Sequence, residues 1–503
     1  NQFLQPIKKN QSLLDKDTFY FLNRSESFSK IRWGGDKLLI SKLWLYNLHY
    51  FDDLNAHRSY ERKEWHYELL ENWIKENKIG SGIGWDPYPT SLRIVNWIKW
   101  YFLGNTFSKN CIHSLVYQAR WLSKRIEWHI LGNHLFANAK ALVFAGLFFS
   151  SKESEKWLNK GIKIICDEIN EQVLDDGGNF ERSPMYHAIF LEDLLDLINI
   201  SQVYENKIQQ SYVDNWKKIA NSMLKWMDAM MHPDGEISFF NDSALGIAPN
   251  FNELNNYANR LRIFYSPQKF NGVMNLSHSG YIRVSSKNAT AMLDVASIGP
   301  DYQPGHAHAD TLSFELSLFD HRLIVNGGTS EYGISKTRQH ERSTKSHNTV
   351  VVNNLNSSEV WNSFRVARRA YPFGLKVKEL DNEINITCAH NGYKRLDGKV
   401  IHRRNWQFFK SSLIIKDFIE GSFDTAYAYF HFHNSISIMK LNNSNFNIQM
   451  PNGQKVNIEI KKGDPVIEAS CYSPEFGKRF NTKCLKLSLN SHGRSCIKLS
   501  WNS

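Results

Sequence analysis

A change in hydrophobic periodicity near Asn271 constrains the fold of this chain more than any other feature. Before it, apolar residues recur every three or four positions, as in amphipathic helices, most clearly over residues 67–75, 91–103, 135–149 and 184–198. Beyond it, short β-branched and aromatic runs are separated by turns. The clearest of these runs are 279–284, 291–296, 311–318, 322–325, 349–352, 402–409, 412–419 and 426–433. Because strand follows strand with no helix between, the pattern favours antiparallel pairing.

The length and this switch predict an α+β multidomain protein. A chain of 503 residues is too long for one ordinary compact domain. We predict a helical toroid domain over residues 1–270 and an antiparallel β-sandwich over residues 271–503, with a cleft between them. The boundary is expected between about Tyr265 and Ser277. Ser183-Pro184 is a helix start, because a hydroxyl cap precedes proline at the first helical position.

The charge balance favours an anionic partner. The formal net charge is +11, yet the Lys and Arg residues are dispersed and no nucleic-acid-binding motif is present. An acidic polysaccharide therefore fits better than DNA or RNA, and a generally basic solvated surface is the alternative. No apolar run is long enough to span a membrane, no CxxC pair suggests a thiolate zinc site, and no protein partner is predicted.

Two helix starts carry candidate catalytic side chains. Asn133 and His134 precede an apolar helix, where the alternative role of Asn133 is that of the capping residue. Tyr186 lies in the first turn of the helix that begins at Pro184, where the alternative is a packed tyrosine with a satisfied hydroxyl.

Histidines form two further clusters. In the stretch from Gly305 to Asp310, strand alternation would place His306 and His308 on one face as a metal or proton-transfer pair. His347 precedes a strand and can supply a third imidazole. The alternatives are an incidental histidine pair and a surface-loop histidine.

Together these clusters resemble the heparinase II/III family of polysaccharide lyases, over the region from about Trp44 to His433. Gly132-Asn133-His134, Ser183-Pro184-Met185-Tyr186-His187, His306-Ala307-His308-Ala309-Asp310 and Ser346-His347-Asn348-Thr349 carry the resemblance. It implies an incomplete (α/α) toroid followed by an antiparallel β-sandwich, in agreement with the periodicity. Residues 43–51 and 357–369 resemble a branch associated with bacterial surface-polysaccharide gene clusters. Capsule or O-antigen-like glycans are therefore expected substrates beside heparan sulfate, in a periplasmic or secreted location.

The resemblance also implies a mechanism of β-elimination on a uronate. The C5 proton lies α to a carboxylate, which must be neutralised before the proton can leave. Asn133 is implied to hydrogen-bond that carboxylate, with His134 assisting, and Tyr186 and His306 match the acid and base residues. Which of the two is the base depends on the C5 configuration of the substrate, which the sequence leaves open.

A structural divalent, zinc-like metal is implied by the same resemblance, with ligands at His308, His347 and position 326. Relatives usually carry Asp at that position, whereas this chain has Asn326, a weaker neutral ligand. The metal is therefore expected to be absent, weakly bound, or completed by another group such as Asp310.

A second departure concerns positive charge at the site. Phe190 stands where some members of the family have an arginine. Arg93 or Arg365 is then expected to supply the charge, and Tyr88 is assigned with them to substrate binding.

Two other functions compete with elimination. A glycoside hydrolase on the same toroid needs two carboxylic acids beside the scissile bond, and Glu181 and Asp242 are the nearest candidates. A catalytically inactive protein that binds acidic glycans is the second alternative. Against it, the Asn, Tyr and His set is intact.

Overall fold

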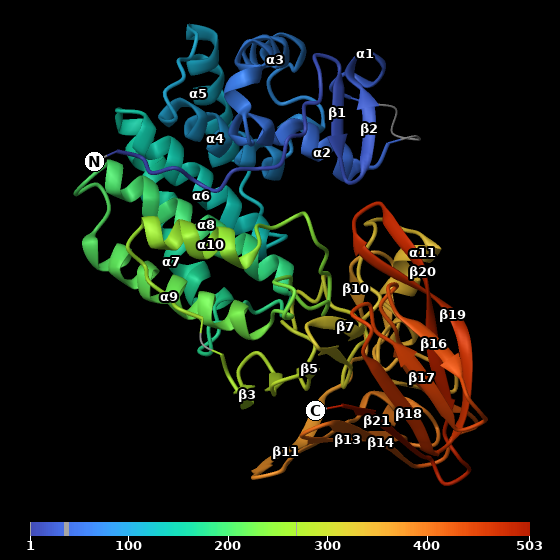
Figure 1. The fold of residues 1–503 in the computed structure, drawn as a ribbon. Helices are drawn as coiled ribbons and strands as arrows, with labels where there is room; N and C mark the ends of the chain where they lie inside the picture. The colour runs from blue at the N-terminus through green and yellow to red at the C-terminus, as the bar shows by residue number, and fades with distance from the viewer. Residues whose placement is uncertain (1, 35–39, 268, 503) are drawn as a thin grey trace. The chain divides into compact units, whose positions relative to one another are not determined.

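The computed structural model describes residues 2–34, 40–267 and 269–502 (Figure 1). Its contacts divide the chain into two compact units. The helical unit comprises Asn1–Val173, Ile189–Ser222 and Asn252–Tyr265, and the sheet unit comprises Leu174–Ala188, Met223–Phe251 and Ser266–Ser503. The units thus interleave along the chain, and the domain boundary expected near residue 270 stays a prediction.

The helical unit contains most of the helices drawn from blue to yellow-green in Figure 1. They are α1 (Phe28–Ile31), α2 (Lys42–Tyr50), α3 (Lys63–Glu76), α4 (Pro87–Phe102), α5 (Lys109–Ser123), α6 (Gly132–Phe148), α7 (Lys152–Gln172), α8 (Pro184–Val203), α9 (Gln210–Ala229) and α10 (Phe251–Arg260). The first turn of α8 and the end of α9 belong to the sheet unit. The four helices expected from periodicity are confirmed as α3, α4, α6 and α8. Nothing in the periodicity indicated the hairpin of β1 (Thr18–Phe21) and β2 (Arg24–Ser27).

Helix α6 is buried along most of its length. Its residues from Leu135 to Leu147 are all buried, as expected of a helix that is apolar on every side. Glycine permits close packing against α7, since a Cβ at Gly146 would lie 2.6 Å from the backbone nitrogen of Leu158. None of the helices in the described ranges is both long and apolar enough to cross a membrane.

The sheet unit is built from antiparallel pairs. A five-stranded sheet has the order β3 (Gly272–Leu276), β4 (Tyr281–Ser285), β5 (Ala289–Asp294), β6 (Phe314–Leu318) and β7 (His321–Ile324). An eight-stranded sheet has the order β11 (Pro372–Leu380), β12 (Glu383–His390), β13 (Ile401–Phe409), β14 (Ser412–Glu420), β21 (Arg494–Trp501), β18 (Lys455–Lys462), β17 (Asn445–Gln449) and β16 (Ser437–Lys440). A four-stranded sheet joins β19 (Asp464–Glu475), β20 (Lys478–Ser488), β15 (Ala426–His431) and β8 (Val350–Val352). β9 (Val360–Trp361) and β10 (Arg365–Val366) form a short hairpin, and α11 (Lys336–Glu341) precedes it.

These three large sheets share one hydrophobic core. It includes Leu316 of the five-stranded sheet, Trp406 of the eight-stranded sheet and Leu485 of the four-stranded sheet, all with no exposed surface. The alternation of buried and partly exposed residues along β13 explains why the sequence revealed it. One strand prediction is wrong at its start: β6 begins at Phe314, and residues 305–310 form an irregular loop.

Candidate active site

The start of α8 fixes the position of Tyr186. The Ser183 hydroxyl accepts a hydrogen bond from the Tyr186 backbone N–H at 3.2 Å, which confirms the predicted cap. The same hydroxyl donates to the Asp242 carbonyl at 2.6 Å. The Tyr186 hydroxyl lies 2.9 Å from the hydroxyl of Tyr332, a residue that the sequence analysis did not single out. The cap thus ties the tyrosine to the loop that carries Asp242.

His306 packs against Tyr186, with ring centroids 3.9 Å apart. Its Nδ1 lies 2.9 Å from Asp242 Oδ2, and its carbonyl accepts from the Asp242 backbone N–H at 2.9 Å. An ionised carboxylate only accepts, so Nδ1 of His306 donates to Asp242. The His306 side chain is 15% exposed, and Nε2 lies 3.6 Å from Glu181 Oε2. This histidine can therefore exchange a proton at Nε2.

Asp242 is the buried anchor of the site. The Arg338 guanidinium binds both carboxylate oxygens, and His308 Nε2 lies 2.8 Å from Oδ1. Burial acts to raise the pKa of Asp242, but the charge of Arg338 and the hydrogen bonds from both histidines hold it well below its usual range. The backbone enters this turn through Asn241, whose φ of 56° is a left-handed conformation.

Both predicted histidines thus meet, but for a different reason from the one expected. Strand alternation was to place His306 and His308 on one face, whereas residues 305–310 are not a strand. Instead, the two rings converge on opposite oxygens of Asp242. The spacing of the histidines was informative, and the residue that joins them lies 64 positions away from His306.

Tyr186 is held in its protonated form. Burial is the main cause that raises its pKa well above the usual value, and Tyr332 and the carboxylates of Asp242 and Glu181 add to the effect. Nearby positive charge would lower the pKa of a tyrosine and suit it to act as both base and acid. The described surroundings raise it instead, which suits a proton donor.

Two of the three implied metal ligands lie as close together as imidazoles that share one ion, whereas the third, Asn326, is hydrogen-bonded to other groups. His308 Nδ1 and His347 Nε2 lie 3.1 Å apart and contact each other directly. The Asn326 amide donates to the Phe239 carbonyl at 2.9 Å, and its oxygen accepts from both nitrogens of Asn348. Within residues 2–34, 40–267 and 269–502, no group of three His, Cys, Asp or Glu side chains is arranged to hold a metal. The metal stays a prediction, which elemental analysis of protein purified without added metal would test.

Asn133 and His134 lie in the helical unit, in the first turn of α6. The capping residue of α6 is Leu131, so the alternative role of Asn133 as the cap is wrong. His134 Nδ1 lies 3.1 Å from Glu127 Oε1, and its ring packs on Tyr88 at 4.4 Å. Tyr88 also hydrogen-bonds Asn133. Asn133, His134 and Tyr88 therefore form one cluster, with Glu127 beside His134.

The two arginines assigned to substrate differ in their surroundings. Arg93 has no exposed surface, lies 3.9 Å over the Trp73 ring, and donates to the carbonyls of His49 and Gly84. This burial argues against direct contact between Arg93 and a substrate. Arg365 is exposed on β10 in the sheet unit. Phe190 packs on Phe136 with centroids 4.1 Å apart.

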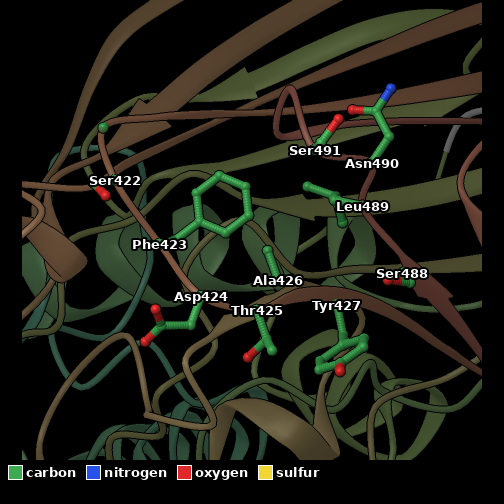
Figure 2. A pocket seen from close by; sticks show the side chains of 11 residues that line it. Ser422, Phe423, Asp424, Thr425, Ala426, Tyr427, Ser488, Leu489, Asn490 and Ser491 are labelled. Carbon is green, nitrogen blue, oxygen red and sulfur yellow. The ribbon is translucent and has the colours of Figure 1, made fainter.

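A separate pocket of about 680 Å³ lies in the sheet unit between residues 421–427 and 488–491 (Figure 2). Phe423, Leu489 and polar side chains line it, with Asp424 as its ionisable carboxylate. None of the predicted site residues is among the described residues around this pocket. The pocket therefore does not indicate where a reaction takes place.

Comparison with known proteins assigns the chain to a family. Residues 50–271 match the family model described as heparinase II/III N-terminus, and residues 271–502 match heparinase II/III-like, C-terminal. The chain belongs to the heparinase II/III family. The resemblance inferred from the clustered motifs is therefore confirmed.

Curated relatives and solved structures extend the comparison. A heparin-sulfate lyase of Bacteroides stercoris is 27% identical over 404 residues, which are 72% of this chain and 55% of the relative. A heparin-sulfate lyase of Pedobacter heparinus is 27% identical over 330 residues, 58% of this chain and 48% of the relative. The chain thus spans about half the length of these relatives. A heparinase III structure matches with a TM-score of 0.78 at 18% identity, covering 95% of this chain and 80% of that one. The predicted fold class, a toroid followed by an antiparallel β-sandwich, is confirmed by this likeness.

Proposed function

We propose that the protein is a polysaccharide lyase that cleaves an acidic, uronate-containing glycan by β-elimination. The observation that carries the proposal is the contact of Tyr186 with His306, with ring centroids 3.9 Å apart. The Tyr186 hydroxyl can donate a proton, and Nε2 of His306, which is not bound to Asp242, can exchange one, so two groups able to move protons lie side by side.

In the proposed reaction, His306 Nε2 takes the C5 proton of the uronate. The C4–O4 bond breaks, a C4=C5 double bond forms, and Tyr186 donates its hydroxyl proton to the departing O4. The hydroxyl of Tyr332, 2.9 Å away, stabilises the tyrosinate that remains. The raised pKa of Tyr186 favours this assignment over one in which the tyrosine is the base.

The substrate class rests on charge and on the relatives. The net charge of +11 suits a polyanion, and the similar proteins named above are heparin-sulfate lyases. The carboxylate-neutralising role of Asn133, with assistance from His134, and the periplasmic or secreted location stay predictions. Heparan sulfate and bacterial surface glycans are the substrates to test first.

The site is less suited to hydrolysis. Asp242 is completely buried, and its pKa is held well below its usual range by Arg338 and two histidines despite the opposing effect of burial. A carboxylate with no exposed surface, and with both oxygens bound by Arg338 and the two histidines, is not placed to act on a glycosidic bond as acid, base or nucleophile. Glu181 would then lack the second carboxylic acid that hydrolysis requires.

A spectroscopic assay tests the proposal. The protein is incubated with heparan sulfate, hyaluronan, chondroitin sulfate and polygalacturonate, and ultraviolet absorbance of the unsaturated uronate is followed. We expect absorbance to rise with at least one polymer, and Tyr186→Phe to abolish most of that rise. Chain shortening without absorbance would indicate hydrolysis, and binding without shortening would indicate an inactive glycan-binding protein.

A further inference from the structure

The β9–β10 hairpin presents an aromatic and a basic side chain together. Trp361 and Arg365 are direct partners in the antiparallel register, so their side chains lie on the same face and next to each other. Trp361 is 52% exposed, and Arg365 is exposed as well. An indole face beside a guanidinium suits a sugar ring that carries an anionic group.

Buried arginines hold this hairpin in place. The Ser363 carbonyl at its tip accepts from Arg338 Nε at 3.2 Å and from Arg342 Nη1 at 3.0 Å. The Gly333 backbone N–H donates to the Ser363 hydroxyl at 2.9 Å. Both arginines have no exposed surface. The hairpin is thus fixed by the same Arg338 that binds Asp242, and a ligand would not have to order it.

The hairpin adjoins the proposed proton-transfer pair. The Phe364 ring lies 5.8 Å from the His306 ring and 5.1 Å from the Tyr332 ring, centroid to centroid. Arg365 follows Phe364 directly, so their Cα atoms are about 3.8 Å apart. A glycan with its reacting unit at His306 would therefore pass the hairpin with a neighbouring unit.

Charge distinguishes Arg365 from the basic residues that follow it. Arg368 pairs with Glu359 at 2.6 Å, and Arg369 pairs with Asp301 at 2.7 Å. Arg365 makes no ion pair or hydrogen bond with any side chain in the described part of the molecule. Its guanidinium is available to an anion from solution.

We propose that Trp361 and Arg365 form a subsite that binds the sugar unit next to the reacting uronate. The indole stacks on the sugar ring, and the guanidinium binds a carboxylate or sulfate through paired N–H donors. The proposal deepens the proposed function, on which it rests for the identity of the polymer as an acidic glycan.

Steady-state kinetics on the polymer that is cleaved tests the subsite. Trp361→Ala and Arg365→Gln are each expected to raise KM about tenfold with kcat nearly unchanged, because they act on binding away from the reacting atoms. Trp361→Phe and Arg365→Lys should recover part of the loss. Lys455→Gln removes an exposed positive charge from β18, and Phe480→Ala removes an exposed ring from β20. Both are matched controls and should leave KM unchanged.

Salt and sulfation separate the contributions of the two residues. The Arg365→Gln effect should shrink at high salt, whereas the Trp361→Ala effect should persist. Comparing hyaluronan with heparan sulfate tells whether the guanidinium binds a carboxylate alone or a sulfate. Unchanged KM in both variants, with folding verified by melting temperature, would overturn the subsite.

Binding measurements distinguish this failure from that of the proposed function. Calorimetry with oligosaccharides of hyaluronan and heparan sulfate is carried out in the Tyr186→Phe background, which does not require turnover. If no polymer is cleaved but Arg365→Gln weakens binding about tenfold, the subsite stands and the lyase assignment fails. If the parent protein binds none of the oligosaccharides, both proposals are contradicted.

Discussion

Two buried clusters of charge, one in each unit, differ in what they leave accessible. In the helical unit, Lys140 Nζ lies 2.6 Å from Asp193 and 2.5 Å from Asp196, and Lys99 also binds Asp196. In the sheet unit, Asp242 is enclosed by Arg338 and His308 in the same manner. Only the second of these clusters is joined to a partly exposed imidazole, His306, whose ring packs at a tilt against a protonated tyrosine.

The difference teaches that buried ion pairs alone do not mark an active site. Each cluster neutralises its own charges, as burial requires. In the sheet unit the carboxylate also accepts a hydrogen bond from Nδ1 of His306. A buried cluster is a candidate functional site when it orients a titratable side chain that a ligand can contact.

The largest effects are expected from breaking each cluster in turn. Asp242→Asn leaves the buried Arg338 guanidinium without a carboxylate partner. Lys140→Met removes one of the two lysines that lie beside the carboxylates of Asp193 and Asp196. Each should lower the free energy of unfolding by about 3 kcal/mol. Asp242→Asn should also lower turnover per folded molecule by about a hundredfold or more, because His306 loses its orienting partner. Lys140→Met should leave turnover per folded molecule unchanged.

Urea unfolding and turnover on the same preparations separate the two effects. If Lys140→Met reduces turnover as strongly as Asp242→Asn at equal folded fraction, the contrast between a structural and a catalytic cluster is wrong.

Mild acid should destabilise the protein through buried neutral histidines and not through the carboxylates of either cluster. Burial lowers the pKa of His187 to about 4 and that of His431 to about 3. An unfolded histidine titrates at about 6.5 and then binds a proton that the folded one does not, so stability falls as pH drops from 6.5 to 4. Asp196, whose pKa of about 2 reflects burial outweighed by Lys140 and Lys99, loses its contribution only below pH 4.

Each pKa unit corresponds to about 1.4 kcal/mol, so the total loss should reach several kcal/mol. Urea unfolding at pH 7, 5.5 and 4 measures it, and His187→Asn should flatten the slope. Constant stability over this range would refute the assignment of neutral buried histidines.

Tyr186→Phe tests whether the tyrosine that packs on the partly exposed His306 takes part in the reaction. The ring and its packing on His306 remain, and the transferable proton is lost. We expect turnover to fall about a hundredfold. The free energy of unfolding should change by only about 1 kcal/mol for one lost hydrogen bond. Near-normal turnover on a confirmed substrate would remove Tyr186 from the mechanism and leave His306 as the principal candidate.

Tyr332→Phe should have a smaller effect. It removes one hydrogen bond to the Tyr186 hydroxyl and keeps the ring between Phe364 and Phe476. A bond of about 1.4 kcal/mol in the transition state corresponds to a tenfold loss of kcat, with KM unchanged. A rise in KM alone would instead make Tyr332 a substrate-binding residue.

The fold was largely predictable because its periodicities are regular. Strands such as β13 alternate buried and partly exposed residues, and α8 begins at a Ser-Pro pair with an ordinary cap. The sequence did not reveal the hairpin of β1 and β2 or the irregular loop at residues 305–310. Short or irregular segments have no hydrophobic periodicity to detect.

Several residues of the candidate site could be predicted from the sequence, but the contacts between them could not. Tyr186, His306 and His308 were chosen from local motifs, and the sheet unit brings them together. Asp242 was considered only as a hydrolytic acid, and Arg338 and Tyr332 were missed. Their partners lie far away in sequence, so no local spacing indicates the contact. Arg93 shows the opposite error, because a charged residue in an amphipathic helix gave no sign of complete burial.

The central claim is that bond cleavage occurs by elimination at the Tyr186–His306 pair. The most direct test is cleavage of the confirmed substrate in water enriched in heavy oxygen, followed by mass spectrometry of the new chain ends. Elimination adds no water, so the account predicts an unsaturated end that is one water lighter than a hydrolytic end, with label entering only by slow exchange of the reducing-end oxygen. Incorporation of heavy oxygen at the new ends, in products of full hydrated mass, would contradict it.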